Sequence, residues 1–261
     1  MRAGPVGFAA LGVYKLMYSI SEATAPIRGA MAKGTRIRVV TYNIHQGRGL
    51  DGLNRLDRII DVLQEVDADV IALQEVMSDQ AATLQEATGM NLIFAPTRRL
   101  AHGFYGNLCL SRLPLVAHKS YNLTCSPFQP RGCLRTDVDY GAGHLHIFNV
   151  HLGLRYRERI KQARMLSDIV DRRTLSWPRL LLGDFNEWFN GRASRLLRAE
   201  FGHPFGRRKR IRTHPSPFPV FPLDRIYHDP AVRIEGVKVH RSRQSRIASD
   251  HLPIYADIRL N

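Results

Sequence analysis

Leu180-Leu181-Leu182-Gly183-Asp184-Phe185-Asn186 is the stretch from which the fold of this 261-residue chain can be worked out. Three consecutive leucines predict a strand buried on both faces. Gly183 lets the backbone turn or approach another segment closely. Asp184 and Asn186 stand where the strand ends, and residues two apart in an extended segment point the same way. Since ligands of layered α/β proteins bind at the carboxyl ends of strands, the stretch predicts a ligand site, although a simple Asn/Asp turn fits these seven residues equally well.

A β-α-β unit near the start of the chain places two further polar residues at strand ends. Residues 36–42 (RIRVVTY) alternate and are rich in β-branched side chains, which predicts a strand that ends at Asn43. Apolar residues at helical spacing over 53–66 predict a helix, and residues 69–73 (DVIAL) predict a buried strand followed by Glu75. A crossover of the usual hand then puts Asn43 and Glu75 on one edge of a sheet.

The middle of the chain is predicted to be antiparallel β-structure. A helix is expected over residues 79–88, ended by Gly89. The short strands expected after it cover residues 92–94, 107–110, 115–121, 133–140 and 144–151, with a hairpin turn at residues 141–143. Asn149 and His151 alternate with apolar residues in the last of these strands, so the two polar side chains share one face.

Two helices and three strands are predicted for the rest of the chain. The helices cover residues 155–173 and 192–199, and the strands cover residues 223–227, 232–240 and 252–260. Residues 203–222 hold five prolines and the basic run from Arg207 to Arg212, which predicts a loop. Without an internal repeat or a linker, residues 35–261 are expected to form one domain, with residues 1–34 as an N-terminal extension.

The first thirty residues combine features of several kinds of segment. Residues 6–14 are an apolar run that resembles the core of a signal peptide, but Lys15 interrupts it and it is short for a membrane span. A weak surface anchor is one alternative, and a true start at Met31 is another. We expect the extension to be dispensable for folding.

The net charge of +15 and the pI near 10.4 indicate a polyanionic partner. Nucleic acid, an anionic membrane surface and a phosphorylated small molecule all fit this charge. The three cysteines have neither the CxxC spacing of a zinc site nor the even number of a disulfide framework, and they fit a reducing compartment. A cytoplasmic protein, with weak association with the inner face of the membrane, is therefore expected.

The polar residues predicted at strand ends form an oxygen-rich set with two histidines. They are Asn43, Glu75, Asn149, His151, Asp184, Asn186, Asp224, Asp250 and His251. Oxygen ligands favour Mg²⁺ or Mn²⁺ over zinc, and Mg²⁺ takes only one or two protein carboxylates, as Glu75 with Asn43 beside it would supply. A histidine that is held by a carboxylate suits acid–base work.

Seven short motifs occur in an order that resembles the endonuclease/exonuclease/phosphatase superfamily, the DNase-I-like metal-dependent phosphohydrolases. They are Asn43, Gln74-Glu75, Gly106-Asn107, Asn149-Val150-His151-Leu152, Gly183-Asp184-Phe185-Asn186, Leu223-Asp224-Arg225-Ile226 and Ser249-Asp250-His251. The resemblance covers residues 38–258. It implies a four-layer α-β-β-α sandwich, with two mixed β-sheets packed face to face and helices outside, in a protein expected to be monomeric.

The resemblance also implies roles for individual residues. Metal binding falls to Glu75, Asn43 and Asp250, and catalysis to His151, Asp184, Asn186, Asp224 and His251. In these roles Asp184 and Asn186 align water and phosphate, and Asp224 and His251 act as a carboxylate–imidazole pair that binds the phosphate. The general base is either Asp184 or this pair, and His151 either protonates the leaving oxygen or stabilises the transition state. Substrate contacts are expected from Asn107, Asn149, Arg135, Arg207, Arg208 and Arg210. One departure is that no acidic residue is evident as a partner for His151, as DNase I has.

The implied activity is Mg²⁺-dependent (or Mn²⁺-dependent) hydrolysis of a phosphoester, principally a phosphodiester, by in-line attack of an activated water. A polyanionic substrate such as nucleic acid is the first expectation. Lipid or inositol-phosphate headgroups at a membrane surface are the alternative, with peripheral membrane contact. An inactive binding protein on the same scaffold ranks below both, because Glu75, Asp184, Asp224 and His251 are all present.

Overall fold

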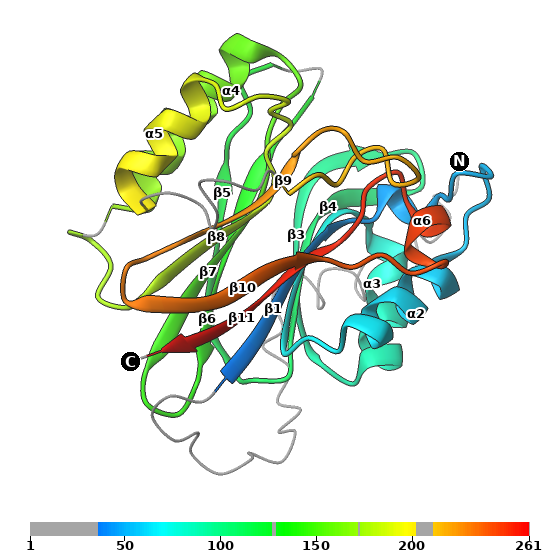
Figure 1. Cartoon of the computed structure of the whole chain (residues 1–261), viewed down its shortest axis with the longest axis horizontal. Coiled ribbons are helices and arrows are strands. Elements are labelled where there is room, and N and C mark those ends of the chain that lie inside the picture. Colours follow the sequence, from blue (N-terminus) through cyan, green and yellow to red (C-terminus); the bar gives the residue numbers. More distant parts are fainter. Residues whose placement is uncertain (1–35, 127–128, 172, 202–210, 261) are drawn as a thin grey trace, which may run out of the picture.

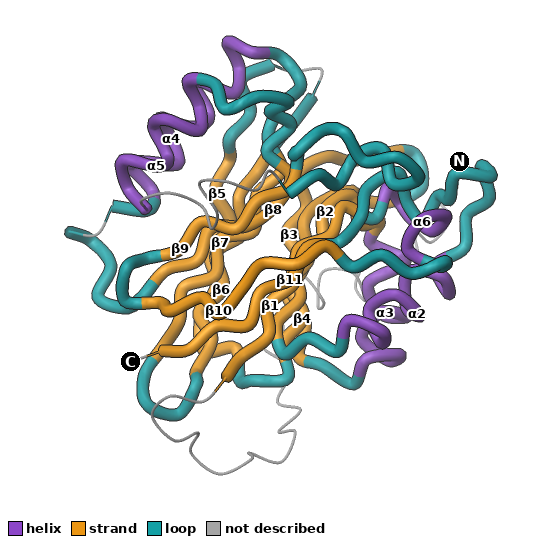
Figure 2. Tube along the Cα trace, viewed as in Figure 1, coloured by secondary structure: helices purple, strands orange, loops and turns teal. Residues whose placement is uncertain are grey.

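Two β-sheets packed face to face, with helices on their outer faces, form the protein (Figures 1 and 2). The computed structural model describes residues 36–126, 129–171, 173–201 and 211–260. The first sheet has the strand order β10-β11-β1-β2-β4-β3 and the second the order β5-β6-β7-β8-β9. The four-layer sandwich with two mixed sheets is thus confirmed.

The element bounds follow the chain from β1 to β11. The first sheet holds β1 (Arg36–Asn43), β2 (Val70–Met77), β3 (Asn91–Leu100), β4 (Gly103–Ser111), β10 (Val232–Val239) and β11 (Ile254–Leu260). The second holds β5 (Leu115–Asn122), β6 (Gly132–Asp139), β7 (His144–His151), β8 (Arg179–Asp184) and β9 (Asp224–His228). The helices are the 3-10 turn η1 (His45–Gly47), α2 (Leu56–Val66), α3 (Ser78–Thr88), α4 (Tyr156–Ile169), α5 (Arg192–Phe201) and the short α6 (Ser245–Ala248).

Three apolar layers hold the sandwich together: one lies between the two sheets, and one lies on the outer face of each sheet. Alternate residues of β1, such as Ile37 and Val39, pack between the two sheets against Leu180 and Leu182 of β8. Val40 and Tyr42, on the other face of β1, pack under α2 and α3. Leu181 packs under α4 and α5. The three leucines of the opening stretch are therefore buried on both faces, as their sequence predicts.

The topology brings the ends of distant strands together. β1 runs parallel to β2, β7 runs parallel to β8, and the remaining pairs are antiparallel. The carboxyl ends of these four strands lie at one end of the sandwich, the upper end in Figure 1, which we call the catalytic end. Gly183 lets β8 approach β7 there: it has φ +147°, and a Cβ at this position would lie 1.9 Å from the Val150 carbonyl oxygen.

Several element boundaries differ from those predicted. β3 and β4 form a hairpin far longer than the predicted strands, because Arg98 and Arg99 extend β3 as exposed residues outside the apolar pattern. The helix that begins near residue 155 ends at Ile169 rather than at residue 173. β2 continues past Glu75 to Met77, and η1 and α6 were not predicted. Residues 1–35 lie outside the described residues. No helix that the structure describes is long and apolar enough to cross a bilayer.

Candidate active site

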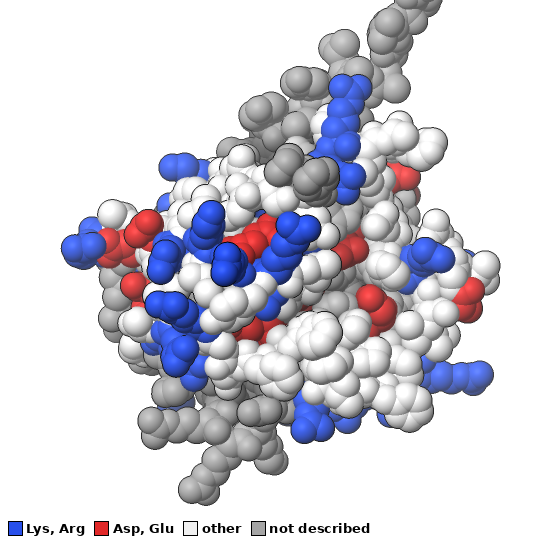
Figure 3. Space-filling view, turned by 90° about the horizontal axis from the view of Figure 1, so that it is seen from above, with Lys and Arg blue, Asp and Glu red and all other residues white. Residues whose placement is uncertain are grey.

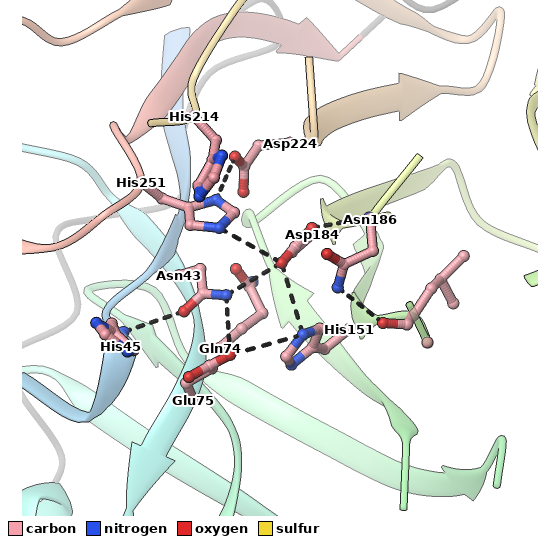
Figure 4. A network of polar contacts seen from close by, with 12 residues as sticks. Asn43, His45, Gln74, Glu75, His151, Asp184, Asn186, His214, Asp224 and His251 are labelled. Carbon is pink, nitrogen blue, oxygen red and sulfur yellow. Dashed lines mark hydrogen bonds and ion pairs between the residues drawn. The ribbon is translucent and has the colours of Figure 1, made fainter. Parts of the chain in front are cut away.

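Polar side chains from both sheets meet at the catalytic end (Figure 4). Asn43 and Glu75 come from the neighbouring strands β1 and β2 of the first sheet. His151 and Asp184 come from β7 and β8 of the second sheet, where they stand directly opposite each other in the parallel pair. The sandwich therefore forms this cluster between its two layers, and neither sheet contains it alone.

Asp184 is at the centre of the cluster and is only 1% exposed. Its Oδ2 accepts a hydrogen bond from Asn43 Nδ2 at 3.0 Å and lies 3.5 Å from His151 Nε2 and 3.8 Å from His251 Nε2. Its Oδ1 accepts from the backbone N–H of Asn186 at 2.8 Å. Burial raises the pKa of Asp184 above the ordinary range of an aspartate, so this carboxylate is a stronger base than one in water.

Asp224 and His251 form the predicted carboxylate–imidazole pair. His251 Nδ1 donates to Asp224 Oδ2 at 2.8 Å, which directs Nε2 toward Asp184. Burial on its own would lower the pKa of His251, but the charges of Asp224 and Asp184 outweigh it and raise the pKa to about 10. In the metal-free protein His251 therefore carries a positive charge at neutral pH.

Glu75 owes its position to a bulge in β2. Its φ is +59°, and the register between β2 and β4 shifts between Leu73 and Val76. The bulge turns the Glu75 side chain toward the cluster, where Oε1 accepts from Asn43 Nδ2 at 3.3 Å and lies 3.8 Å from His151 Nε2. The acidic groups nearest the His151 ring are thus Asp184 and Glu75 themselves. Burial lowers the pKa of His151 well below its ordinary value, so this imidazole is neutral.

Asn43 lies beside Glu75 as predicted, but it presents a different atom. Its Oδ1 accepts the backbone N–H of His45 at 3.0 Å, while Nδ2 donates to both carboxylates. Reversing the amide would oppose two N–H groups, so the His45 backbone determines the orientation. In this arrangement the Asn43 N–H group links Glu75 and Asp184. The side-chain oxygen of Asn43 faces the His45 backbone and not a metal that these carboxylates would bind.

Asn149 joins the two sheets and does not face a substrate, which corrects its predicted role. The side chain is completely buried, donates from Nδ2 to the carbonyls of Leu73 and Leu108 at 2.9 Å, and accepts from Gln74 Nε2 at 2.8 Å. Asn107 also spans the sheets, because its Nδ2 donates to the carbonyls of Gly132 and Asn149 at 3.2 Å. These amides satisfy backbone groups beside the cluster and so fix the spacing of the sheets there.

Of the four arginines that were predicted to contact the substrate, Arg135 lies among the described residues, and its position corrects the prediction. Arg135 lies on the outer face of β6 with Asp137, to which it donates from Nε at 2.7 Å and from Nη2 at 2.6 Å. The cluster lies on the inner side, and strand alternation puts Leu134, not Arg135, toward the other sheet. Arg135 is therefore not a residue of this site. Arg207, Arg208 and Arg210 fall outside the described residues.

A second polar group borders the cluster and was only partly predicted. Asp250 Oδ1 lies 3.8 Å from His45 Nδ1, and its Oδ2 lies 3.7 Å from His214 Nε2. Burial would raise the pKa of Asp250, but His214, His251 and His45 outweigh it and the pKa falls to about 2. Sequence reasoning missed His45 and His214. Their signals were the position of His45 two residues after Asn43 and of His214 inside the proline-rich loop.

The residues present fit a divalent cation. Carboxylate oxygens of Asp184 and Asp224 lie within 4.8 Å of one another, and Glu75 stands on the other side of Asp184. Asp224 Oδ1 is buried and has no hydrogen-bond partner among the described residues, an arrangement that a cation or its water would relieve. The donors are mostly carboxylate oxygens, which are the ligands that Mg²⁺ and Mn²⁺ prefer.

Comparison with known proteins agrees with the family resemblance that the sequence motifs indicate. The family model described as the Endonuclease/Exonuclease/phosphatase family matches residues 40–251. The uncharacterized protein YbhP of Escherichia coli is 30% identical over 247 residues, which cover 85% of this chain and 96% of YbhP. A structure of Danio rerio TDP2 complexed with single-strand DNA product has a TM-score of 0.66 at 17% identity, with 86% of this chain and 99% of that chain covered.

The mannosyl-6-phosphatase Bt3783 of Bacteroides thetaiotaomicron has the same fold. Its TM-score is 0.66 at 18% identity, with 85% of this chain and 99% of that chain covered. At these identities the two solved structures are evidence for the fold alone, and the assignment of the family rests on the match between the sequence and the family model. From residue 40 to residue 251, where Asn43, Glu75, His151, Asp184, Asp224 and His251 all lie, this chain is a member of the endonuclease/exonuclease/phosphatase family.

Proposed function

We propose that this protein is a Mg²⁺-dependent phosphodiesterase that cleaves a polyanionic substrate by in-line attack of water. Members of its family generally hydrolyse phosphoester bonds, and the proposal adds the metal and the ester class. The main observation behind the proposal is the buried Asp224–His251 pair, whose His251 Nε2 faces Asp184 where the two sheets meet. His151 and Glu75 lie on the other side of Asp184.

Each residue of the cluster has a part that its surroundings support. Asp184, whose burial makes it more basic, orients the attacking water and takes its proton. His251 is charged and placed to neutralise a phosphate oxygen. His151 is neutral, and its Nε2, which faces the carboxylates of Glu75 and Asp184, donates a hydrogen bond to the phosphate or to the leaving oxygen. Mg²⁺, held by Glu75 and the adjacent carboxylates, would neutralise charge on the phosphate.

The metal requirement is tested with a small diester that needs no recognition surface. Hydrolysis of bis-p-nitrophenyl phosphate is measured with Mg²⁺, with Mn²⁺ and with EDTA. We expect activity with either metal and none in EDTA, and full activity in the chelator would overturn the proposal.

Active-site variants test the residues. Glu75→Gln, Asp184→Asn and His251→Asn should each lower kcat by roughly a hundredfold or more, because each removes a group that stabilises the transition state. Glu86→Gln, an exposed acid on α3, is the matched control and should keep normal turnover. Circular dichroism of every variant separates loss of chemistry from loss of fold.

The ester class is assigned by comparing two substrates in the same preparation. The mannosyl-6-phosphatase acts on a phosphate monoester by its name, whereas TDP2 was crystallised with a single-strand DNA product. Turnover of bis-p-nitrophenyl phosphate against p-nitrophenyl phosphate therefore distinguishes the two chemistries. We expect the diester to be hydrolysed faster, and a faster monoester would remove the phosphodiesterase assignment while leaving the metal mechanism in place.

A further inference from the structure

Exposed apolar side chains gather at the catalytic end of the molecule. Eleven large apolar side chains are exposed among the described residues. Nine of them belong to loops or helix starts beside the active-site residues, and we call these nine the apolar rim: Leu50, Leu53, Leu154, Tyr156, Trp188, Phe189, Phe218, Val220 and Ile247. The other two lie at the end of the sandwich opposite the catalytic end: Val116 is near the start of β5, and Trp177 precedes β8. Exposed apolar residues are ordinary when scattered, but this concentration marks an interaction surface.

The apolar rim is built from loops of both sheets. Leu50 and Ile247 are joined by a hydrogen bond from Leu50 N to Ile247 O at 3.0 Å, which puts them beside the segment that carries His251. Trp188 lies two residues after Asn186 and packs against Phe221, with ring centroids 4.7 Å apart. Loops that follow β1, β7 and β8 and the loop before β9 all contribute, so the rim is a property of the catalytic end and not of one loop.

An open pocket of about 220 Å³ lies within the rim. Tyr156, Trp188 and Phe189 form its apolar wall, and Arg159, Glu187 and Gly191 complete it. Glu187 and Trp188, which line the pocket, directly follow Asn186 of the site in the chain. The pocket therefore adds apolar surface to the catalytic end, on the segment that follows Asn186.

Exposed arginines lie on the same loops and helix starts as the residues of the apolar rim. Arg48, Arg155, Arg157, Arg192, Arg212 and Arg246 are exposed on the same loops and helix starts. None of the six forms an ion pair with another residue that the structure describes, in contrast to Arg55, which pairs with Asp57 at 2.6 Å. Figure 3 looks down on this end and shows Lys and Arg side chains around areas of uncharged surface. Unpaired arginines are available for an anionic partner.

We propose that the catalytic end docks on an anionic phospholipid surface, so that the ester presented to the site is a lipid headgroup. The choice of substrate rests on the proposed phosphodiesterase function, whereas the docking surface does not. Arginines attract the negative headgroups, and Trp, Tyr and Phe with aliphatic side chains enter the boundary between headgroups and acyl chains.

The composition of the rim favours lipid over single-stranded nucleic acid. Single strands are bound by aromatic rings on which bases stack, together with a basic groove. Five of the nine rim residues are aliphatic: Leu50, Leu53, Leu154, Val220 and Ile247. Aliphatic side chains on separate loops offer no stacking platform, but they add buried apolar area at a membrane interface.

The two tryptophans of the chain provide a matched test in the full-length protein. The only tryptophans are Trp177 and Trp188. Trp188 is in the rim, and Trp177 precedes β8 at its far end, roughly 20 Å from Asp184 by strand rise. Trp177→Phe leaves Trp188 as the sole fluorophore, and Trp188→Phe leaves Trp177. Each variant is mixed, in EDTA so that no turnover occurs, with vesicles of pure phosphatidylcholine or of phosphatidylcholine with 30% phosphatidylglycerol.

We expect the fluorescence of Trp188 to shift to the blue with the anionic vesicles and to be quenched by brominated acyl chains, while that of Trp177 does not change. Co-sedimentation should show roughly tenfold weaker vesicle binding for Leu50→Ser/Leu53→Ser, on a loop distant in sequence from Trp188, and no change for Val116→Ser. Raising the salt concentration should also weaken binding, because the arginine contribution is screened.

Three results would overturn the proposal. They are no response of either tryptophan to anionic vesicles, an equal response of both, and rim variants that lose affinity for a single-stranded oligonucleotide but not for vesicles. Because binding is read in EDTA, an inactive enzyme that still docks would reject the proposed hydrolysis alone. An active enzyme on bis-p-nitrophenyl phosphate that ignores vesicles would reject docking alone.

Discussion

The pair formed by Asp224 and His251 makes the stability of the protein depend on pH. The pKa of His251 is raised to about 10 in the folded, metal-free protein, against 6.5 for an ordinary histidine. A raised pKa stabilises the fold fully below pH 6.5, and the stabilisation is lost as the pH rises through 10. In EDTA, urea unfolding should therefore show a loss on the order of 2 kcal/mol between pH 7 and pH 10.

Asp224→Asn is the control for this pH dependence. It removes the charge that raises the pKa of His251, so the difference in unfolding free energy between wild type and variant should shrink as the pH rises. A constant difference from pH 7 to pH 10 would contradict the assignment. NMR titration of the His251 imidazole gives the pKa directly.

Asn43 keeps two carboxylates together, which predicts a metal-dependent defect when its amide is replaced. Asn43→Asp turns a donor shared by Glu75 and Asp184 into a third negative charge. In EDTA at pH 8 the unfolding free energy should fall by on the order of 2 kcal/mol, and Mg²⁺ should restore much of it. Asn43→Ala loses the hydrogen bonds without adding charge, so Mg²⁺ should restore less. Equal recovery of the two variants in thermal unfolding would contradict this account.

At the scale of single elements, Gly183 is the position least tolerant of a side chain. A Cβ there would meet the Val150 carbonyl at 1.9 Å, and its φ of +147° is unfavourable for other residues. Gly183→Ala should force β7 and β8 apart and cost about 3 kcal/mol or more of unfolding free energy. Gly89→Ala is the control: it also has positive φ, +64°, but has open space around it, and should cost about 1 kcal/mol. Urea unfolding of both variants measures the difference.

The elements that sequence predicted well are those whose apolar pattern is uninterrupted. β1, β7, β8 and the β-α-β unit follow alternating, continuous apolar or helical patterns, and their ends are within a few residues of those predicted. β3 was underestimated because a two-stranded hairpin can continue through polar residues such as Arg98 that no pattern marks. The α6 turn, four residues long, has no periodicity to detect.

The sequence predicted the central residues of the candidate site but not how their side chains are oriented and hydrogen-bonded. Strand ends and the family motifs identified Glu75, Asp184 and His251, since polar residues at such positions stand out from apolar runs. Which atom Asn43 presents depends on the His45 backbone, and the structural use of Asn149 depends on carbonyls of β2 and β4. Contacts between the two sheets leave no trace in a single sequence, whereas the outward direction of Arg135 follows from its alternation with Leu134 in the predicted strand.

For the whole molecule, the charge and the fold are expected to be independent of the N-terminal extension. Residues 1–30 contain Arg2, Lys15, Arg28 and Glu22, so their removal leaves a net charge of +13. A variant that begins at Met31 should keep its far-UV circular dichroism and its Tm, because all the strands that the structure describes lie from Arg36 onward. An insoluble or unfolded variant would show that the extension belongs to the fold.

The order of strands in the first sheet has a consequence for synthesis of the protein. β11 lies between β10 and β1, so the last of the described strands is the antiparallel partner of the first. A nascent chain that has exposed β1, β2, β7 and β8 still lacks His251 and the strand that covers the edge of β1. The first sheet and the site are therefore completed only after β1 to β8 have been synthesised, when the segment that carries Asp224, His251 and β11 becomes available for pairing.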